Sequence, residues 1–288
     1  MLSKTDNTEV LQPASKDKIK QVQVLERARR ILRTLADCPN PISLHEISEM
    51  TEIHMSTVHR LLWNLAQDGL VDRMSNGRWR LGLTFLEYGS LVRDRLDIRE
   101  KAIGVMQLLF ERTGQTINLA IRRNDSIMYI EHVYAPGTGI RLARRIGAMA
   151  PLHCTSGGKL FLSDMTPEEV SAYISRTGLA PRTEHSINTP EKLIMEINRV
   201  KELGWADDKE ELETGIRCIG APIRDKTGHI VATVTVASSI EMRHKPDWVR
   251  HLLSAVNAVS ASLYRVSEIP RQRKKIISLE WYRLYGRY

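Results

Sequence analysis

Residues 43–69 carry the feature that most restricts what this chain can fold into: a short helix, a tight turn and a second helix. Ser43 and Glu46 have the spacing of a capping box, in which each side chain accepts an amide hydrogen bond at the start of a helix. The run STVHRLLWNLAQDG then repeats apolar residues at helical spacing, and Gly69 supplies a left-handed end. The predicted buried stripe of this second helix is Val58, Leu61, Leu62 and Leu65.

The segments on either side extend this pattern into a larger module. Residues 25–35 repeat apolar side chains at helical spacing, and Asn40-Pro41 stops that helix. After Gly69, the runs LVDRM and RWRLG flank an Asn-Gly turn that is typical of a β-hairpin. Helix, short helix, turn, helix and hairpin together predict a winged helix-turn-helix. In that module the helix after the turn enters the major groove of DNA.

Polar side chains on the second helix and on the hairpin are the candidate DNA contacts. The side chains off the buried stripe are Ser56, Thr57, His59, Arg60, Trp63, Asn64 and Gln67. Hydroxyl, imidazole, guanidinium and amide groups suit phosphates and base edges, so we select Ser56, Thr57, His59, Arg60 and Asn64. The hairpin adds Arg73, Arg78 and Arg80, placed to follow a phosphate backbone. A module that binds another protein, with this side merely solvated, is the alternative.

Bulk charge adds little to the DNA prediction. Most of the net charge of +8 lies in the tail 265–288, and a basic tail is more typical of a solvated chain end than of a nucleic-acid arm. Residues 1–20 are polar, lack the core of a signal peptide and are expected to be a disordered lead-in. We expect no membrane partner. The three cysteines are widely spaced, which favours a reducing cytoplasm over a disulfide framework.

The last two thirds of the chain mix strands and helices. Strands are predicted at 116–124, 126–134, 139–145, 215–225 and 229–237, and helices at 99–114, 159–165, 167–178, 191–204 and 246–264. Because the two kinds of element do not alternate strictly, the expected class is α+β with an antiparallel sheet. The predicted division is a lead-in (1–20), a winged helix-turn-helix domain (21–82), a linker helix (83–97), a second domain (98–264) and a basic tail (265–288).

The segment APLHCTSGGK, residues 150–159, is the richest candidate for chemistry. Ser156 and Lys159 form an S-x-x-K pattern, and later S-x-N and K-T-G triplets follow in the order used by penicillin-recognising enzymes. An acyl-transfer enzyme that uses these two residues is therefore the alternative function. The three patterns span too short a segment for that fold, and two glycines occupy the turn between serine and lysine. The segment also lacks the glycine and the hydroxyl that a phosphate-binding loop requires at set positions around the Gly-Lys pair.

Two further interpretations of this segment concern metal and anion binding. His153 and Cys154 are adjacent, so in an extended chain they point to opposite sides and form a poor metal corner. No metal and no cofactor are expected. The amides of Ser156, Gly157 and Gly158 precede a predicted helix and are suited to hold a carboxylate. The segment is therefore predicted to be the wall of a ligand pocket.

Several stretches resemble a known family. LERARRIL, ISLHEISEMTEIHMSTVHRLLWNLAQDGLV and RWRLGLTFLEYGS are similar to the DNA-binding domain of the IclR family of bacterial transcription regulators. PLHCTSGGK and GWADDKEELETGIRCIGAPIRD resemble the effector-binding domain of that family, a GAF-like α+β fold. The resemblance covers about residues 22–263. Glu52 stands where the family usually has a turn glycine, so it is expected to adopt positive φ, and Met55 replaces a common basic residue.

The resemblance implies a function and a set of ligand contacts. It implies a DNA-binding regulator, not an enzyme, that is controlled by a small organic or aromatic acid. The linker helix would join two subunits into a dimer, with a tetramer as the alternative. The matching effector positions are Ser156, Gly157, Asp208, Cys218, Thr235 and Ala237. Ala237 replaces a frequent serine, which suggests a less polar or bulkier effector than a simple keto acid. In the acidic run 207–213, only Asp208 is expected to face inward.

Overall fold

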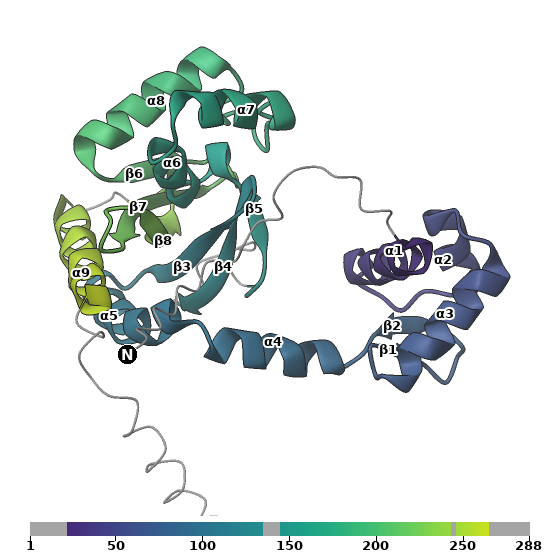
Figure 1. Ribbon diagram of the computed structural model, residues 1–288. Helices are drawn as coiled ribbons and strands as arrows, with labels where there is room; N and C mark the ends of the chain where they lie inside the picture. The colour runs from purple at the N-terminus through teal and green to yellow at the C-terminus, as the bar shows by residue number, and fades with distance from the viewer. Residues whose placement is uncertain (1–21, 135–144, 243–245, 265–288) are drawn as a thin grey trace, which may run out of the picture. The chain divides into compact units, whose positions relative to one another are not determined.

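The computed structural model describes residues 22–134, 145–242 and 246–264. The chain divides into two compact units, Met1–Val92 and Arg93–Tyr288, which we describe separately (Figure 1). The predicted lead-in, the basic tail and all but the last residue of the strand predicted at 139–145 lie outside the described residues. Within the described ranges, none of the helices is long and apolar enough to cross a membrane.

The first unit is the predicted winged helix-turn-helix. Its elements are α1 (Gln23–Asp37), α2 (Leu44–Thr51), α3 (Met55–Gln67), β1 (Val71–Arg73), β2 (Trp79–Leu81) and α4 (Thr84–Asp94). The two strands pair antiparallel as a hairpin. The helices and the hairpin close over one hydrophobic core made of Ile31, Leu35, Ile42, Ile47, Ile53, Val58, Leu61, Leu62, Val71 and Trp79. Helix α4 follows the hairpin and contributes no buried residue to this core.

Both ends of α2 are held by specific contacts. The capping box is confirmed, because the Ser43 amide donates to Glu46 Oε2 at 2.6 Å and the Glu46 amide donates to Ser43 Oγ at 3.2 Å. At the other end Glu52 has φ 53° and ψ 30°, the left-handed conformation expected from the missing glycine. Arg30 of α1 donates to the carbonyl of Thr51 at 2.8 Å, which satisfies one of the carbonyls left free where α2 ends.

The second unit is a six-stranded antiparallel sheet in the order β5-β4-β3-β8-β7-β6. The strands are β3 (Thr116–Arg123), β4 (Ser126–Val133), β5 (Met149–Pro151), β6 (Ala206–Lys209), β7 (Ile216–Arg224) and β8 (Ile230–Ser239). The helices are α5 (Asp97–Thr113), α6 (Ser156–Ser163), α7 (Pro167–Thr177), α8 (Pro190–Leu203) and α9 (Pro246–Tyr264), with a short 3-10 turn, η2 (Leu152–Cys154), before α6. The α+β class with an antiparallel sheet is therefore confirmed.

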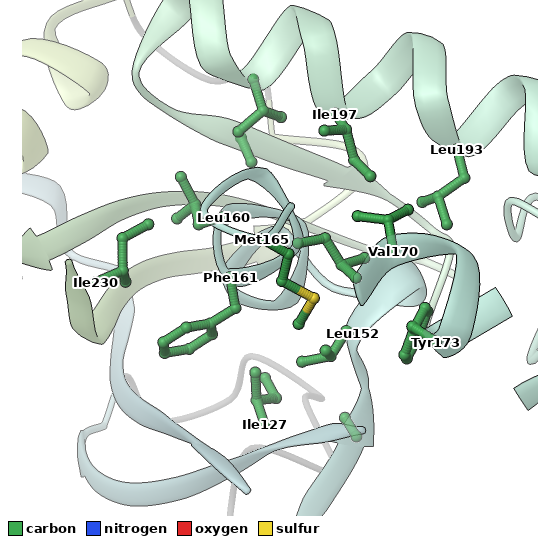
Figure 2. Close-up of a cluster of buried hydrophobic side chains, with 14 of the residues drawn as sticks. Ile127, Leu152, Leu160, Phe161, Met165, Val170, Tyr173, Leu193, Ile197 and Ile230 are labelled. Carbon is green, nitrogen blue, oxygen red and sulfur yellow. The ribbon is translucent and has the colours of Figure 1, made fainter. Parts of the chain in front are cut away.

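Helices cover both faces of this sheet (Figure 1). Helices α5 and α9 pack on one face around a core that includes Met106, Leu119 and Val234. Helices α6, α7 and α8 cover the opposite face (Figure 2). Figure 2 shows Leu193 and Ile197 of α8 pointing towards α6, and buried residues such as Leu160 of α6 pack in the same cluster. Helix α6 therefore lies in the interior of the unit, and both of its long sides are covered.

Candidate functional site

The exposed side of α3 carries the predicted DNA contacts. Ser56, His59, Arg60 and Asn64 are exposed and Thr57 is half-buried, on the side away from the buried stripe. The Asn64 side-chain amide donates to the Arg60 carbonyl at 2.7 Å. His59 Nε2 accepts from the indole of Trp63 at 2.9 Å, so the proton of the neutral imidazole sits on Nδ1 and is available as a donor. The guanidinium of Arg60 has no hydrogen bond or ion pair with any described residue.

The start of α3 contains a contact that the sequence prediction missed. His54 caps the helix, because its Nδ1 accepts from the Ser56 amide at 3.3 Å and lies 2.8 Å from Ser56 Oγ. The hydroxyl of Ser56 is therefore partly engaged within the protein. The position immediately before the helix was the available signal, although histidine is not among the usual capping residues.

The three arginines predicted on the wing all have partners within the protein. The Arg73 guanidinium lies 5.7 Å from the ring centroid of Trp63 and 5.9 Å from that of Trp79. Arg78 donates to the Pro41 carbonyl at 3.1 Å and to Glu46 at 3.2 Å. Arg80 pairs with Asp72 across the hairpin, at 3.2 Å. Their positive charge is thus partly compensated. Among the arginines predicted to contact DNA, Arg60 is the one whose guanidinium has no hydrogen bond, ion pair or aromatic ring contact with a described residue.

Helix α6 begins at Ser156, three residues before the predicted start at Lys159. Thr155 is its cap, and the Thr155 hydroxyl accepts from the Gly158 amide at 3.0 Å. The Gly158 amide is therefore already used, which corrects its predicted role as an anion donor. The first intrahelical hydrogen bond runs from the Lys159 amide to the Thr155 carbonyl at 2.9 Å. The amides of Ser156 and Gly157 precede that bond and keep the geometry of a carboxylate site.

Sheet register brings the predicted effector residues onto the face covered by α6. Asp208 pairs with Cys218, and Cys218 pairs with Ala237, so these three lie in one row across β6, β7 and β8. The next row along contains Thr235, which pairs with Gly220. A Cβ at Gly220 would lie 3.1 Å from Ser156 Oγ and 3.2 Å from Thr235 Cγ2. The close approach of α6 to the sheet thus depends on Gly220, which the sequence prediction missed.

The acidic run that follows α8 is more buried than expected. Asp207, Asp208 and Glu211 expose 9%, 3% and 7% of their surface, so the prediction that only Asp208 faces inward is wrong. Asp208 Oδ1 accepts from the Glu211 amide at 2.8 Å. Burial and the neighbouring Glu211 carboxylate raise the pKa of Asp208 to about 7. This carboxyl therefore changes its charge near neutral pH.

Lys159 holds the acidic loop in place. Its Nζ donates to Glu196 Oε1 at 3.2 Å, to the Asp207 carbonyl at 2.8 Å and to Glu211 Oε1 at 2.6 Å. Burial alone would lower the pKa of Lys159, but the Glu211 and Glu196 carboxylates outweigh it and raise the pKa. A charged amine whose three hydrogens are donated cannot act as a base for Ser156. The geometry therefore gives no support to the acyl-transfer alternative.

His153 and Cys154 also have structural positions. His153 Nδ1 lies 2.6 Å from the Tyr173 hydroxyl, and its Nε2 lies 3.2 Å from the Ala180 carbonyl. A carbonyl can only accept, so Nε2 carries the proton and Nδ1 accepts from the tyrosine. Both nitrogens are thereby committed, and Cys154 is buried as a free thiol. Across the part of the chain that the structure describes, no group of three or more His, Cys, Asp or Glu side chains is placed to hold a metal.

Comparisons with known proteins agree with this architecture. Residues 24–74 match the IclR helix-turn-helix domain, and residues 91–265 match the bacterial transcriptional regulator IclR C-terminal domain. The HTH-type transcriptional regulator KipR of Bacillus subtilis is 33% identical over 224 residues, which cover 78% of this chain and 89% of KipR.

Solved structures show the same fold. The IclR of Thermotoga maritima aligns with a TM-score of 0.68 at 29% identity, over 84% of this chain and 98% of that one. An IclR homolog from Microbacterium hydrocarbonoxydans, complexed with 4-hydroxybenzoate, aligns with a TM-score of 0.73 at 22% identity, over 84% and 99% of the two chains. The helix-turn-helix match lies within the first structural unit, and the C-terminal match begins at the end of α4 and continues through the second unit. This chain belongs to the IclR family of bacterial transcription regulators.

Proposed function

We propose that this regulator binds double-stranded operator DNA through α3 and the wing, and that a small organic acid bound by the second unit changes its affinity for DNA. In this proposal residues 21–82 form the DNA-binding domain, 83–97 the linker helix and 98–264 the effector domain. The effector would act by binding more tightly to one of two arrangements of the regulator and shifting their populations. Because operator DNA is the target, we place the protein in the bacterial cytoplasm.

The free guanidinium of Arg60 is the observation that carries the DNA-binding proposal. It projects from the exposed side of α3, one turn before Asn64, and has no partner among the described residues. An exposed, uncompensated cation on the helix after the turn is what a phosphate or a guanine edge requires. The wing arginines are oriented by Glu46, Asp72 and the tryptophan rings, so we assign them to positioning the wing beside the phosphate backbone.

Arg60→Ala is expected to weaken operator binding about ten-fold or more, because it removes a charge-assisted contact. The measurement is a gel-shift titration with an operator recovered by in vitro selection on the wild-type protein. Arg112→Ala, which removes an exposed arginine from α5, is the matched control and should leave affinity unchanged. Equal affinity of the Arg60 variant and the wild type would instead favour a helix-turn-helix that binds protein.

Exposed apolar side chains on α4 support self-association. Phe85, Tyr88 and Val92 expose 38%, 54% and 61% of their surface, and the whole helix buries none of its residues in the single chain. Apolar side chains on a helix without a covered face are typical of a subunit interface. We therefore propose a two-fold dimer through α4, which would present two α3 helices to a palindromic operator.

The free amides at the start of α6 and the buried row beneath them support the effector proposal. The Ser156 and Gly157 amides favour a carboxylate, and Thr235 lies directly under the helix start. The adjacent row contains Asp208, Cys218 and Ala237, of which only the carboxyl is strongly polar. This weakly polar surround suits an aromatic or otherwise bulky acid better than a small keto acid. One relative has been solved with an aromatic acid, 4-hydroxybenzoate, which makes aromatic acids the first to test.

A panel of organic acids is expected to contain members that raise the melting temperature, because a ligand that binds only the folded state stabilises it. The measurement is a thermal-shift screen of the full chain, with benzoates and aliphatic keto and hydroxy acids. Asp208→Ala should reduce the shift, since Asp208 lies in the proposed site. If the shift in that variant is undiminished, the effector does not bind at this row of residues. If no acid shifts the melting temperature of the wild type, the effector is not an organic acid of these classes.

A further inference from the structure

A row of polar residues extends across the sheet from the start of α6 towards β4. Thr235 pairs with Gly220 on one side and with Asn118 on the other, and Asn118 pairs with His132. Directly paired residues of neighbouring strands share a face of the sheet. Gly220 approaches Ser156, so this row runs on the α6 side from the proposed carboxylate site through Thr235 and Asn118 to His132. The proposed effector contacts include Thr235 but stop before the last two.

Two side-chain atoms at the far end of this row are buried without a partner among the described residues. Asn118 is 2% exposed, and its Nδ2 donates to Thr235 Oγ1 at 3.3 Å, yet its Oδ1 accepts no hydrogen bond from any described residue. His132 Nδ1, on the neighbouring strand, is also buried and has no partner in the part of the chain that the structure describes. The hydroxyl of Thr233, which lies against Gly157, is a third such atom. Leaving a buried polar group unpaired is unfavourable, so three such atoms on one side of the sheet indicate a polar ligand.

The chemistry of these atoms restricts that ligand. An asparagine Oδ1 can only accept a hydrogen bond, and a carboxylate can only accept as well. The carboxylate that the α6 amides would hold is therefore unable to satisfy Asn118. A hydroxyl can, because it donates through its hydrogen and still accepts through its oxygen, and the His132 nitrogen can meet it in either role.

We propose that Asn118 and His132 form a second polar contact of the effector site, and that this contact selects hydroxy acids, in which a hydroxyl donates to Asn118 Oδ1. The assignment rests on the proposed function, because it takes the carboxylate end of the ligand to lie at α6. It adds a specificity element on β3 and β4, away from the α6 end of the site. An acid with an ether or a hydrogen in place of the hydroxyl leaves Asn118 unpaired and binds more weakly.

Two matched sets of acids test this assignment by thermal shift and by calorimetric Kd on the full chain. One set is 4-hydroxybenzoate, 4-methoxybenzoate and benzoate, and the other is lactate, 2-methoxypropionate and propionate. The hydroxy member of a binding set is expected to bind the wild type about ten-fold more tightly than its methoxy and unsubstituted analogues. Asn118→Leu and, more weakly, His132→Phe should remove that preference. Asn257→Leu, the same change in an exposed asparagine of α9, should retain it.

The outcomes separate this assignment from the function on which it rests. Equal binding of all members of a set, or tight binding of the methoxy acid, would overturn the role of Asn118 and leave the acid effector intact. No shift with any acid in the wild type would overturn both. If Asn118→Leu with Thr235→Val lowers the melting temperature of the free protein by several degrees, ordered water already satisfies Asn118 and the assignment is wrong. A melting temperature at or above that of the wild type supports it.

Discussion

At the scale of single residues, buried charge organises the loop between β6 and β7. Lys159 supplies one buried ammonium, and Glu196 and Glu211 take two of its hydrogens. A further carboxyl, Asp208, lies beside this cluster without an ion pair to any described residue and accepts the Glu211 amide instead. The pKa of Glu196 is lowered because Arg199, together with Lys159, outweighs the effect of burial, whereas burial raises the pKa of Glu211 in spite of its pairing with Lys159. Burial and the neighbouring Glu211 carboxylate raise the pKa of Asp208 to about 7. Asp208 is therefore the group whose ionisation is most weakly compensated.

Replacement of Asp208 by asparagine is expected to flatten the pH dependence of stability. Its pKa rises from 3.8 to about 7 on folding, so the folded state holds the proton more tightly than the unfolded chain. The free energy of unfolding therefore falls as the pH rises through this interval and levels off above it, by at most about 4 kcal/mol. Asparagine can still accept the Glu211 amide. Urea unfolding of both proteins between pH 5 and 8 measures the effect, and parallel curves would contradict it.

At the scale of elements, the start of α6 lies closer to the sheet and to the preceding turn than it could if positions 157 and 158 carried side chains. A Cβ at Gly157 would lie 2.7 Å from Thr233 Oγ1, and one at Gly158 would lie 2.3 Å from the Leu152 carbonyl oxygen. The two glycines lower helix propensity, which is why the sequence predicted a later start for the helix. Their role is steric, since they let the helix end lie against the sheet and against the preceding turn.

Alanine at these two glycines is expected to destabilise the protein, by about 1–3 kcal/mol at Gly157 and by more at Gly158. At Gly158 the obstacle is backbone, which cannot move aside as a side chain can. Gly104→Ala on α5 is the matched control, because nothing lies within 4 Å of its added methyl, and it should gain up to about 1 kcal/mol of stability. Urea unfolding ranks the three variants, and a Gly158 variant as stable as the wild type would refute the packing argument.

At the scale of the whole molecule, two separate cores are connected through a helix that belongs to neither. The boundary between the units falls within α4, between Val92 and Arg93. Arg93 at its end and Arg99 of α5 both donate to the buried Glu131 of β4 at 2.6 Å. Glu131 precedes His132, so the carboxylate that holds the end of α4 neighbours a proposed effector contact.

Glutamates on the apolar stripe of α4 are expected to dissociate the proposed dimer. Phe85, Tyr88 and Val92 recur at the spacing of one helix face, and charge there opposes burial against a second subunit. A protein with Tyr88→Glu and Val92→Glu should sediment as a monomer and lose operator affinity although α3 is intact. Ser90→Glu, on the opposite side of the helix, is the control and should stay dimeric. Dimers of unchanged affinity in the double variant would exclude α4 as the interface.

The sequence by itself determined several helix ends and the modular order, because these depend on contacts within a few residues. The capping box at Ser43 and the glycine-ended helices are local, and the helix-turn-helix follows from them. Such local signals placed α3 and its polar side. The resemblance to the family, which usually has a glycine at the position of Glu52, predicted the left-handed conformation of that residue.

Only the tertiary structure decided how distant residues combine. The hydrogen bond between Asn118 and Thr235 spans 117 positions, and the one between Lys159 and Glu211 spans 52. Pairing at such separations depends on strand order and register, which local patterns do not encode. Burial of Asp207 and Glu211 and the partners of the wing arginines follow from the same long-range packing. The residue types at the site were therefore predictable, whereas their charge states and unpaired atoms depend on neighbours that only the folded chain brings together.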